Sequence, residues 1–186
     1  FACNAQVIHV DIDSAETGKN RLPEIGIIGD INQIITSLIN LITRKKLSTS
    51  MFTYSWKERI LNWKEQYPLV VPKQISKISP QEILYELNQI AKTSFFTTDV
   101  GQHQMWAAQF FTYTKPRTFL SSGGLGTMGY GFPAAIGAQL GCPDKIVVDI
   151  AGDGSIQMNI QEMSTAVRLN IPVKIAILNN GFLGMV

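Results

Sequence analysis

The sequence predicts an α/β fold with a parallel sheet, because apolar segments rich in β-branched residues alternate with segments of helical periodicity. Residues 145–151 and 173–178 have the composition of two buried strands of such a sheet. Between them, from about Ser155, apolar residues recur at three- and four-residue steps, as on one face of an amphipathic helix. Pro172 marks the end of that helix, because the residue before a proline is disfavoured in the α region. The sequence therefore predicts a βαβ unit here.

The N-terminal part predicts a second, smaller α/β unit. Residues 6–12 and 24–28 have the pattern of strands, and residues 31–41 have the pattern of a helix with isoleucine and leucine on one face. We expect residues 1–43 to end one domain and residues 44–78 to form a linker.

Another domain is predicted to begin at residue 79 and to run to residue 186. Residues 79–82 (SPQE) form a capping box with proline at the first helical position, which predicts the start of a helix. A strand beginning at Phe95 is expected to lead through a polar loop into another helix. A short strand over residues 118–120 and a helix over residues 133–140 follow.

Composition limits the possible functions. The chain is 45% hydrophobic and 16% charged, as in globular domains, and its net charge of +2 predicts no nucleic-acid partner. Two cysteines are too few for a disulfide framework, and no apolar run reaches the length of a membrane span. Because the chain begins with Phe1 and stops shortly after Asn180, we expect it to be an internal fragment of a longer protein.

The most informative motif is Gly152-Asp153-Gly154, followed after 24 intervening residues by Asn179-Asn180. Parallel strands end at the same edge of a sheet, so Asp153 and Asn180 are expected to emerge together. Carboxylate and amide oxygens suit Mg²⁺, which completes its coordination with water and substrate phosphate oxygens. The alternative is an ordinary turn, in which the aspartate caps a helix and the asparagines form a later turn.

Residues 124–129 match the pattern GxGxxG, which also occurs in dinucleotide-binding domains. The strand predicted before it is very short, and the acid expected about 20 positions later falls at Asp144, before a strand and not after one. A glycine-lined cofactor pocket is the favoured interpretation.

The GDG and NN motifs together resemble the thiamine-diphosphate binding motif, in which the aspartate and the second asparagine hold a metal that holds the diphosphate. Residues 99–111, 121–138 and 152–166 resemble the large, catalytic subunit of acetolactate synthase, also called acetohydroxyacid synthase. The resemblance covers nearly the whole chain and is weakest over residues 44–77. It implies the end of a flavin-binding α/β domain, a linker, and the start of a thiamine-diphosphate-binding α/β domain with a parallel sheet.

The resemblance also implies the residues of a thiamine-diphosphate site. Asp153, Asn180 and the main-chain carbonyl of Phe182 would hold Mg²⁺. The full set implied to contact thiamine diphosphate is Gln102, His103, Gly126, Thr127, Met128, Asp153, Gly154, Ser155, Asn180, Gly181 and Phe182. Within it, Gln102 and His103 would lie at the diphosphate, and Met128 would be the apolar wedge that bends the cofactor. Core packing is the alternative for Met128, and a structural role is the alternative for His103.

A flavin site is implied for the N-terminal unit. Two strands there end in acidic residues, a pattern that suits recognition of a nucleotide ribose, although from the residues alone helix caps or turn acids are the favoured explanation. By resemblance, FAD would be lined by Asp11, Ile12, Asp13, Gly29 and Asp30. Thr17 departs from the aliphatic residue usual there.

The function implied is decarboxylation of pyruvate on thiamine diphosphate and transfer of the two-carbon unit to pyruvate or 2-oxobutyrate, the first common step of branched-chain amino-acid biosynthesis. The family also implies a dimer of large subunits, a regulatory small subunit, and an activating glutamate in an N-terminal domain outside this chain. We therefore expect no catalytic residue in the fragment and no activity from it alone.

Two other functions remain open. One is a different thiamine-diphosphate enzyme, such as pyruvate oxidase or glyoxylate carboligase, and the other is a non-catalytic nucleotide-binding module. The richness in Ile, Asn, Lys and Gln, with the resemblance, suggests an algal plastid-encoded enzyme of the stroma, with bacterial cytoplasm as the alternative.

Overall fold

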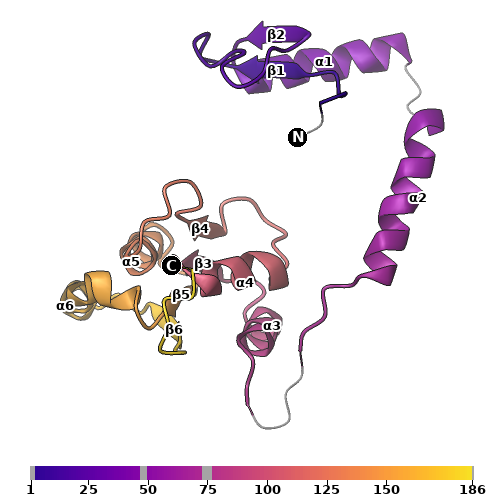
Figure 1. The fold of residues 1–186 in the computed structure, drawn as a ribbon. Coiled ribbons are helices and arrows are strands. Elements are labelled where there is room, and N and C mark those ends of the chain that lie inside the picture. Colours follow the sequence, from indigo (N-terminus) through magenta and orange to yellow (C-terminus); the bar gives the residue numbers. More distant parts are fainter. Residues whose placement is uncertain (1–2, 47–49, 73–76, 186) are drawn as a thin grey trace. The chain divides into compact units, whose positions relative to one another are not determined.

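The computed structural model describes residues 3–46, 50–72 and 77–185, and the chain divides into two compact units between Pro68 and Leu69 (Figure 1). This division falls within the segment predicted to be a linker. None of the described helices is long and apolar enough to cross a membrane. All the buried hydrophobic residues among those described belong to the second unit.

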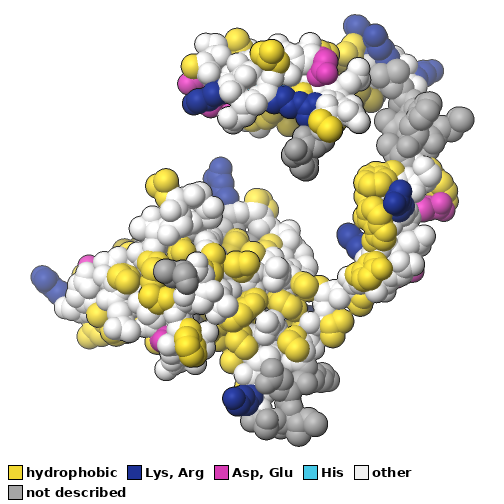
Figure 2. Space-filling model, viewed as in Figure 1, with side chains coloured by type: hydrophobic (Ala, Val, Ile, Leu, Met, Phe, Trp, Pro, Cys, Tyr) yellow, Lys and Arg dark blue, Asp and Glu magenta, His cyan; other side chains and the backbone are white. Residues whose placement is uncertain are grey.

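The first unit contains two parallel strands and two helices. Strand β1 (Ile8–Asp11) pairs with β2 (Ile25–Ile28), and α1 (Ile31–Lys45) and α2 (Ser50–Gln66) follow. Helix α1 extends beyond the predicted end at residue 41, and α2 occupies much of the predicted linker. Hydrophobic side chains, among them Trp56 and Trp63, lie exposed on α2 (Figure 2). The two indole rings meet edge to face with centroids 5.6 Å apart.

The second unit is an α/β domain with a four-stranded parallel sheet, which confirms the predicted fold class (Figure 1). Its strands, in spatial order, are β4 (Phe119–Ser121), β3 (Phe95–Thr98), β5 (Val147–Gly152) and β6 (Lys174–Leu178). Its helices are α3 (Pro80–Ile90), α4 (Gln102–Phe110), α5 (Gly131–Gly141), the 3₁₀ helix η1 (Ile156–Glu162) and α6 (Met163–Arg168).

Helix α3 begins where the capping box predicts. The Ser79 hydroxyl accepts a hydrogen bond from the backbone N–H of Glu82 at 3.2 Å, and Pro80 occupies the first turn. Leu84, on the next turn, is completely buried. The cap therefore fixes the start of the helix so that its apolar face packs on the sheet.

Side chains of β5 alternate between two hydrophobic cores, as the period of a strand requires. Val148 and Ile150 pack with residues of α3 and α4 in one core, which also contains Phe96 of β3. Ala151 packs with residues of α5 and η1 in the other. Helices therefore cover both faces of the sheet, and the strand is buried along its whole length.

The helix predicted between β5 and β6 is not continuous, which corrects that expectation. Within η1, Asn159 has φ −134° and ψ 33°, outside the helical region, and the regular helix α6 starts only at Met163. The Asn159 amide donates to the Gly129 carbonyl at 2.7 Å and accepts from Gln161 Nε2 at 3.1 Å. Asparagine side chains compete with helical backbone hydrogen bonds in this way, so a tertiary contact interrupts the periodic pattern.

The strand order creates a crevice between β3 and β5. From β3 the chain passes through α4 to β4 on one side, whereas from β5 it passes through η1 and α6 to β6 on the other. Open α/β sheets bind ligands outside the carboxyl ends of the strands at such a reversal point. The topology therefore places a ligand site directly after β3 and β5.

Candidate cofactor site

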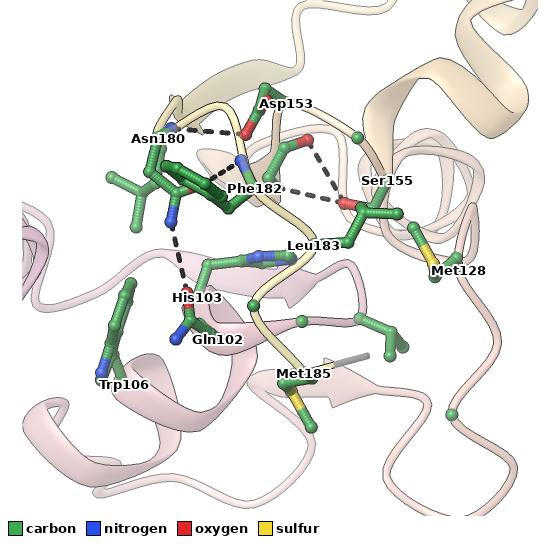
Figure 3. Close-up of a pocket in the computed structure, with 17 residues that line it drawn as sticks. Gln102, His103, Trp106, Met128, Asp153, Ser155, Asn180, Phe182, Leu183 and Met185 are labelled. Atoms are coloured by element: carbon green, nitrogen blue, oxygen red, sulfur yellow. Dashed lines mark hydrogen bonds between the residues drawn. The ribbon is translucent and has the colours of Figure 1, made fainter.

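A cavity of about 320 Å³ lies at this position (Figure 3). It is lined by residues 100–103 and Trp106 after β3, by Gly126 and Met128 after β4, and by residues 152–155 at the end of β5 and after it. Residues at the end of β6 and beyond it, as far as Met185, complete the lining. Loops after all four strands therefore contribute to one site, of a size typical of small-molecule pockets.

Asp153 and Asn180 lie next to each other, as the βαβ spacing predicts. The backbone N–H of Asn180 points to Asp153 Oδ1 across 3.4 Å. Asn180 Oδ1 accepts from the backbone N–H of Phe182 at 3.0 Å, and Asn180 Nδ2 donates to Gln102 Oε1 at 3.2 Å (Figure 3). Gln102, 78 positions earlier in the chain, thus helps to orient the asparagine amide.

This donor set fits a magnesium ion. Asp153 contributes a carboxylate and Asn180 an amide oxygen, and Phe182 has a main-chain carbonyl close by in sequence. Among the described residues, no three side chains of His, Cys, Asp or Glu are grouped in a way that could hold a metal. Mg²⁺ does not require such a group, because one or two protein oxygens suffice when phosphate oxygens and water complete the octahedron.

The imidazole of His103 is wedged against two glycines. A Cβ atom on Gly152 would lie 2.8 Å from His103 Nδ1, and one on Gly101 would lie 2.9 Å from the same nitrogen. Gly101 also has φ +154°, which L side chains rarely adopt. Glycine at these two positions is therefore what allows the ring to lie at the carboxyl ends of β3 and β5.

His103 is suited to contact a ligand in its neutral form. Its side chain is buried, and Nε2 has no hydrogen-bond partner among the described residues. Burial lowers the pKa of the imidazole below its usual range, and the carboxylates of Asp99 and Asp153 act in the opposite direction. A neutral ring with one unsatisfied nitrogen in the lining of a cavity is a potential hydrogen-bonding group for a bound molecule.

Ser155 is held within the turn after β5. Its hydroxyl accepts from the Gly152 N–H at 3.1 Å and donates to the Gly152 carbonyl at 3.3 Å. A Cβ on the neighbouring Gly154 would lie 2.5 Å from Leu183 Cδ2, so this glycine allows the segment after β6 to pack closely on the turn. A cofactor contact from the Ser155 hydroxyl remains a prediction.

The structure does not bring every predicted residue to the cavity wall. Of the set given above, Thr127 and Gly181 are absent from the described lining, and the Thr127 N–H donates to Ser122 Oγ at 3.0 Å. Sequence reasoning missed Trp106, Leu183 and Met185, which line the cavity. Trp106 lies one helical turn after Gln102, so spacing along α4 could have identified it. No local sequence pattern identifies Leu183 or Met185 as lining residues.

The residues predicted to bind FAD lie together at one edge of the first unit. Asp11 pairs with Ile28 across the two strands, so residues 11–13 and 29–30 follow neighbouring strand ends. Asp11 Oδ1 accepts from the Asp13 N–H at 2.9 Å, and Asp13 Oδ1 accepts from the Ala15 N–H at 2.8 Å. Asp30 caps α1 through the N–H groups of residues 32 and 33. One oxygen of each acid is thus used in a turn or cap, and flavin binding stays a prediction.

The residues of this site lie in a segment that matches a known domain model. Residues 99–186 match the model of the thiamine pyrophosphate enzyme C-terminal TPP-binding domain. An acetolactate synthase large subunit of Porphyra purpurea is 55% identical over 186 residues, which is 100% of this chain and 31% of that relative. A large subunit of Cyanidium caldarium is 50% identical over the whole chain and 32% of the relative. Acetolactate synthase 2, chloroplastic, of Nicotiana tabacum is 46% identical over the whole chain and 28% of the relative.

The chain thus spans about a third of the length of these relatives, and the matched domain contains the cavity described above. Residues 99–186 therefore match the TPP-binding domain of thiamine pyrophosphate enzymes, and the chain along its whole length is similar to a segment of the acetolactate synthase large subunit.

Proposed function

We propose that the protein containing this chain is an acetolactate synthase, which decarboxylates pyruvate on thiamine diphosphate and transfers the two-carbon unit to pyruvate or 2-oxobutyrate. The observation that carries the proposal is the convergence of Asp153, Asn180 and Gln102 at the cavity between β3 and β5. The names of the relatives support the choice of reaction.

Within this site, Asp153, Asn180 and the carbonyl of Phe182 would hold Mg²⁺, which in turn would bind the diphosphate. Gln102 keeps the amide of Asn180 oriented, so the asparagine does not have to reorganise when the metal binds. The bound cofactor supplies an electron sink for decarboxylation and two-carbon transfer.

The remaining lining residues shape the site. Trp106, Met128 and Leu183 are apolar side chains of the lining, and they would help to exclude water from the bound cofactor. The unsatisfied Nε2 of neutral His103 would form a hydrogen bond to the diphosphate if it carries the ring proton.

Further parts of the proposal rest on the family. FAD would occupy the edge formed by Asp11–Asp13 and Gly29–Asp30, and the protein would function as a dimer of large subunits with a regulatory small subunit. Plastid stroma is the proposed location, supported by the chloroplastic relatives, and bacterial cytoplasm is the alternative, supported by a relative of Parasynechococcus marenigrum that is 47% identical.

Replacement of the proposed metal ligand tests cofactor binding. In the full-length protein, Asp153→Ala should weaken Mg²⁺-dependent binding of thiamine diphosphate by at least about 100-fold, because a charged metal ligand is lost. Isothermal titration measures this, with Asp144→Ala as the control because Asp144 is an exposed acid outside the cavity lining. Unchanged affinity in Asp153→Ala would contradict the proposed site and favour a non-catalytic nucleotide-binding module.

A product assay tests the reaction. The full-length protein should form acetolactate from pyruvate when Mg²⁺, thiamine diphosphate and FAD are supplied. Acetyl phosphate as the product would instead indicate a pyruvate oxidase, and activity restricted to glyoxylate would indicate a carboligase of that substrate.

A further inference from the structure

Gly129, the residue after Met128, is held by side chains on both sides of its backbone. Its N–H donates to Asp99 Oδ1 at 2.7 Å, and its carbonyl accepts from Asn159 Nδ2 at 2.7 Å. Asp99 follows β3 and Asn159 lies in η1, so these two hydrogen bonds connect three separate segments around one residue. Gly129 itself is buried.

This arrangement requires glycine. Gly129 has φ +90°, and a Cβ there would lie 2.7 Å from Asn159 Nδ2 and 2.9 Å from Met158 Cβ. No larger residue therefore fits between the loop after β4 and η1 without displacing one of them. The backbone on either side of Gly129 is restricted to one path.

Asp99 and Asn159 are each constrained by a further feature of the structure. Asp99 has no exposed surface, and the same Oδ1 also accepts from the Val100 N–H at 2.8 Å. One carboxylate oxygen thus connects the segment that leads to Gln102 with the loop that carries Met128. Asn159 occupies the non-helical conformation that interrupts the predicted helix, and this interruption accompanies the hydrogen bond to Gly129.

We propose that Asp99 and Asn159 are positioning residues that fix the peptide following Met128 and thereby hold the Met128 side chain in the cofactor cavity. The inference rests on the proposed function, because it assigns Met128 to the thiamine portion of the cofactor. Neither Asp99 nor Asn159 lines the cavity. Asn159 therefore reaches a ligand only through the loop, whereas Asp99 also holds the Val100 N–H in the segment that leads to Gln102.

Two ligands separate this role from a general loss of stability. Thiamine diphosphate would occupy both the metal end and the Met128 end of the cavity, whereas inorganic diphosphate with Mg²⁺ would need only the metal end. In the full-length protein, Asn159→Ala should weaken the binding of thiamine diphosphate by about 10-fold, which is the effect expected from the loss of one hydrogen bond. It should leave the affinity for inorganic diphosphate within about 2-fold, because the Asp153 and Asn180 contacts remain.

Gln139→Ala is the matched control. Gln139 is also a buried amide that donates to backbone carbonyls, those of Cys142, Pro143 and Lys145, but it lies at the other end of α5 and outside the cavity lining. This variant should lose stability without loss of affinity for either ligand. Asp99→Asn, which keeps an acceptor oxygen for Gly129 and Val100, should bind thiamine diphosphate nearly as the wild type does, whereas Asp99→Ala should weaken that binding at least as much as Asn159→Ala does.

The outcomes are distinct. Unchanged binding of thiamine diphosphate by Asn159→Ala would overturn the positioning role and leave the proposed function intact. The role would also be overturned if Asn159→Ala weakened the binding of both ligands equally. The same holds if Asn159→Ala and Gln139→Ala changed the affinity for thiamine diphosphate equally. Failure of the wild-type protein to bind thiamine diphosphate with Mg²⁺ would overturn the proposed function, and this inference with it. Should Asp99→Ala not fold, Asn159→Ala and Asp99→Asn decide the question.

Discussion

Asp149 is an acidic residue in the middle of β5 with no exposed surface. Its Oδ1 accepts from the Thr97 hydroxyl at 2.8 Å, and its Oδ2 has no partner among the described residues. The pKa of this carboxyl is raised to about 7. Burial is the main cause and the neighbouring charge of Asp99 adds to it, whereas the Thr97 hydrogen bond acts in the opposite direction. The side chain is therefore largely protonated below neutral pH, where a charged form would be costly so deep in the sheet.

This shift predicts a pH-dependent effect of Asp149→Asn. Between about pH 4 and about pH 7, Asp149 keeps its proton in the folded protein but loses it in the unfolded chain. The free energy of unfolding therefore falls as the pH rises through this range. The neutral variant avoids that loss. Its gain in free energy of unfolding should be about 2 to 3 kcal/mol larger at about pH 8 than at about pH 5. Chemical denaturation at the two pH values measures it, and a gain independent of pH, or one shared by the exposed control Asp144→Asn, would contradict the assignment.

At the scale of elements, helix α5 is packed so closely on the sheet that its first residue has no room for a side chain. A Cβ on Gly131 would lie 2.5 Å from Asp149 Oδ1 and 2.5 Å from the backbone nitrogen of Asp99. Backbone cannot move aside as the end of a flexible side chain can. Gly137, in the same helix, has nothing within 4 Å of the corresponding position.

The two glycines therefore predict opposite effects of the same substitution. Gly131→Ala should destabilise the protein by about 2 kcal/mol or more, because α5 has to move away from β3 and β5. Gly137→Ala should be neutral or stabilise it by up to about 1 kcal/mol, since alanine restricts the unfolded chain and favours the helix. Urea denaturation of the two variants compares them directly. Similar effects of the two substitutions would contradict the close contact with the sheet as the cause of the loss at Gly131.

At the scale of the whole molecule, the described cofactor cavity belongs to the second unit, and it contains few groups able to exchange protons. Asp153 is the one acid among its described lining residues, and it is the residue proposed to hold the metal. The family resemblance places the glutamate that activates the cofactor outside this chain. Binding of the diphosphate and activation of the thiamine would thus reside in different parts of the polypeptide.

A polypeptide limited to these 186 residues should consequently form no acetolactate from pyruvate, whereas the full-length protein should form it. A colorimetric assay for acetolactate compares the two at equal concentration. Titration with thiamine diphosphate and Mg²⁺ in the same sample shows whether the short polypeptide retains its binding site. Acetolactate formation by the short polypeptide would contradict the division of roles.

Much of the fold could be predicted from local signals in the sequence. The capping box marked the start of α3 at Ser79, and the β-branched runs marked β5 and β6 to within a few residues. Because both strands are parallel neighbours, the spacing of the motif alone brought Asp153 and Asn180 together. These features depend on hydrogen bonds and side-chain periodicity within one or two elements, which a sequence displays directly.

The tertiary structure decided what depends on contacts between distant segments. The strand order β4-β3-β5-β6, which creates the crevice, follows from non-local pairing that no window of sequence contains. Asn159 interrupts a helix that its own periodicity favours because its amide bonds to Gly129, 30 residues earlier. Leu183 and Met185 became cavity lining only because the segment after β6 folds over the turn at Gly154. The sequence by itself determined the elements and the paired metal-ligand motif, whereas packing between elements determined which side chains surround it.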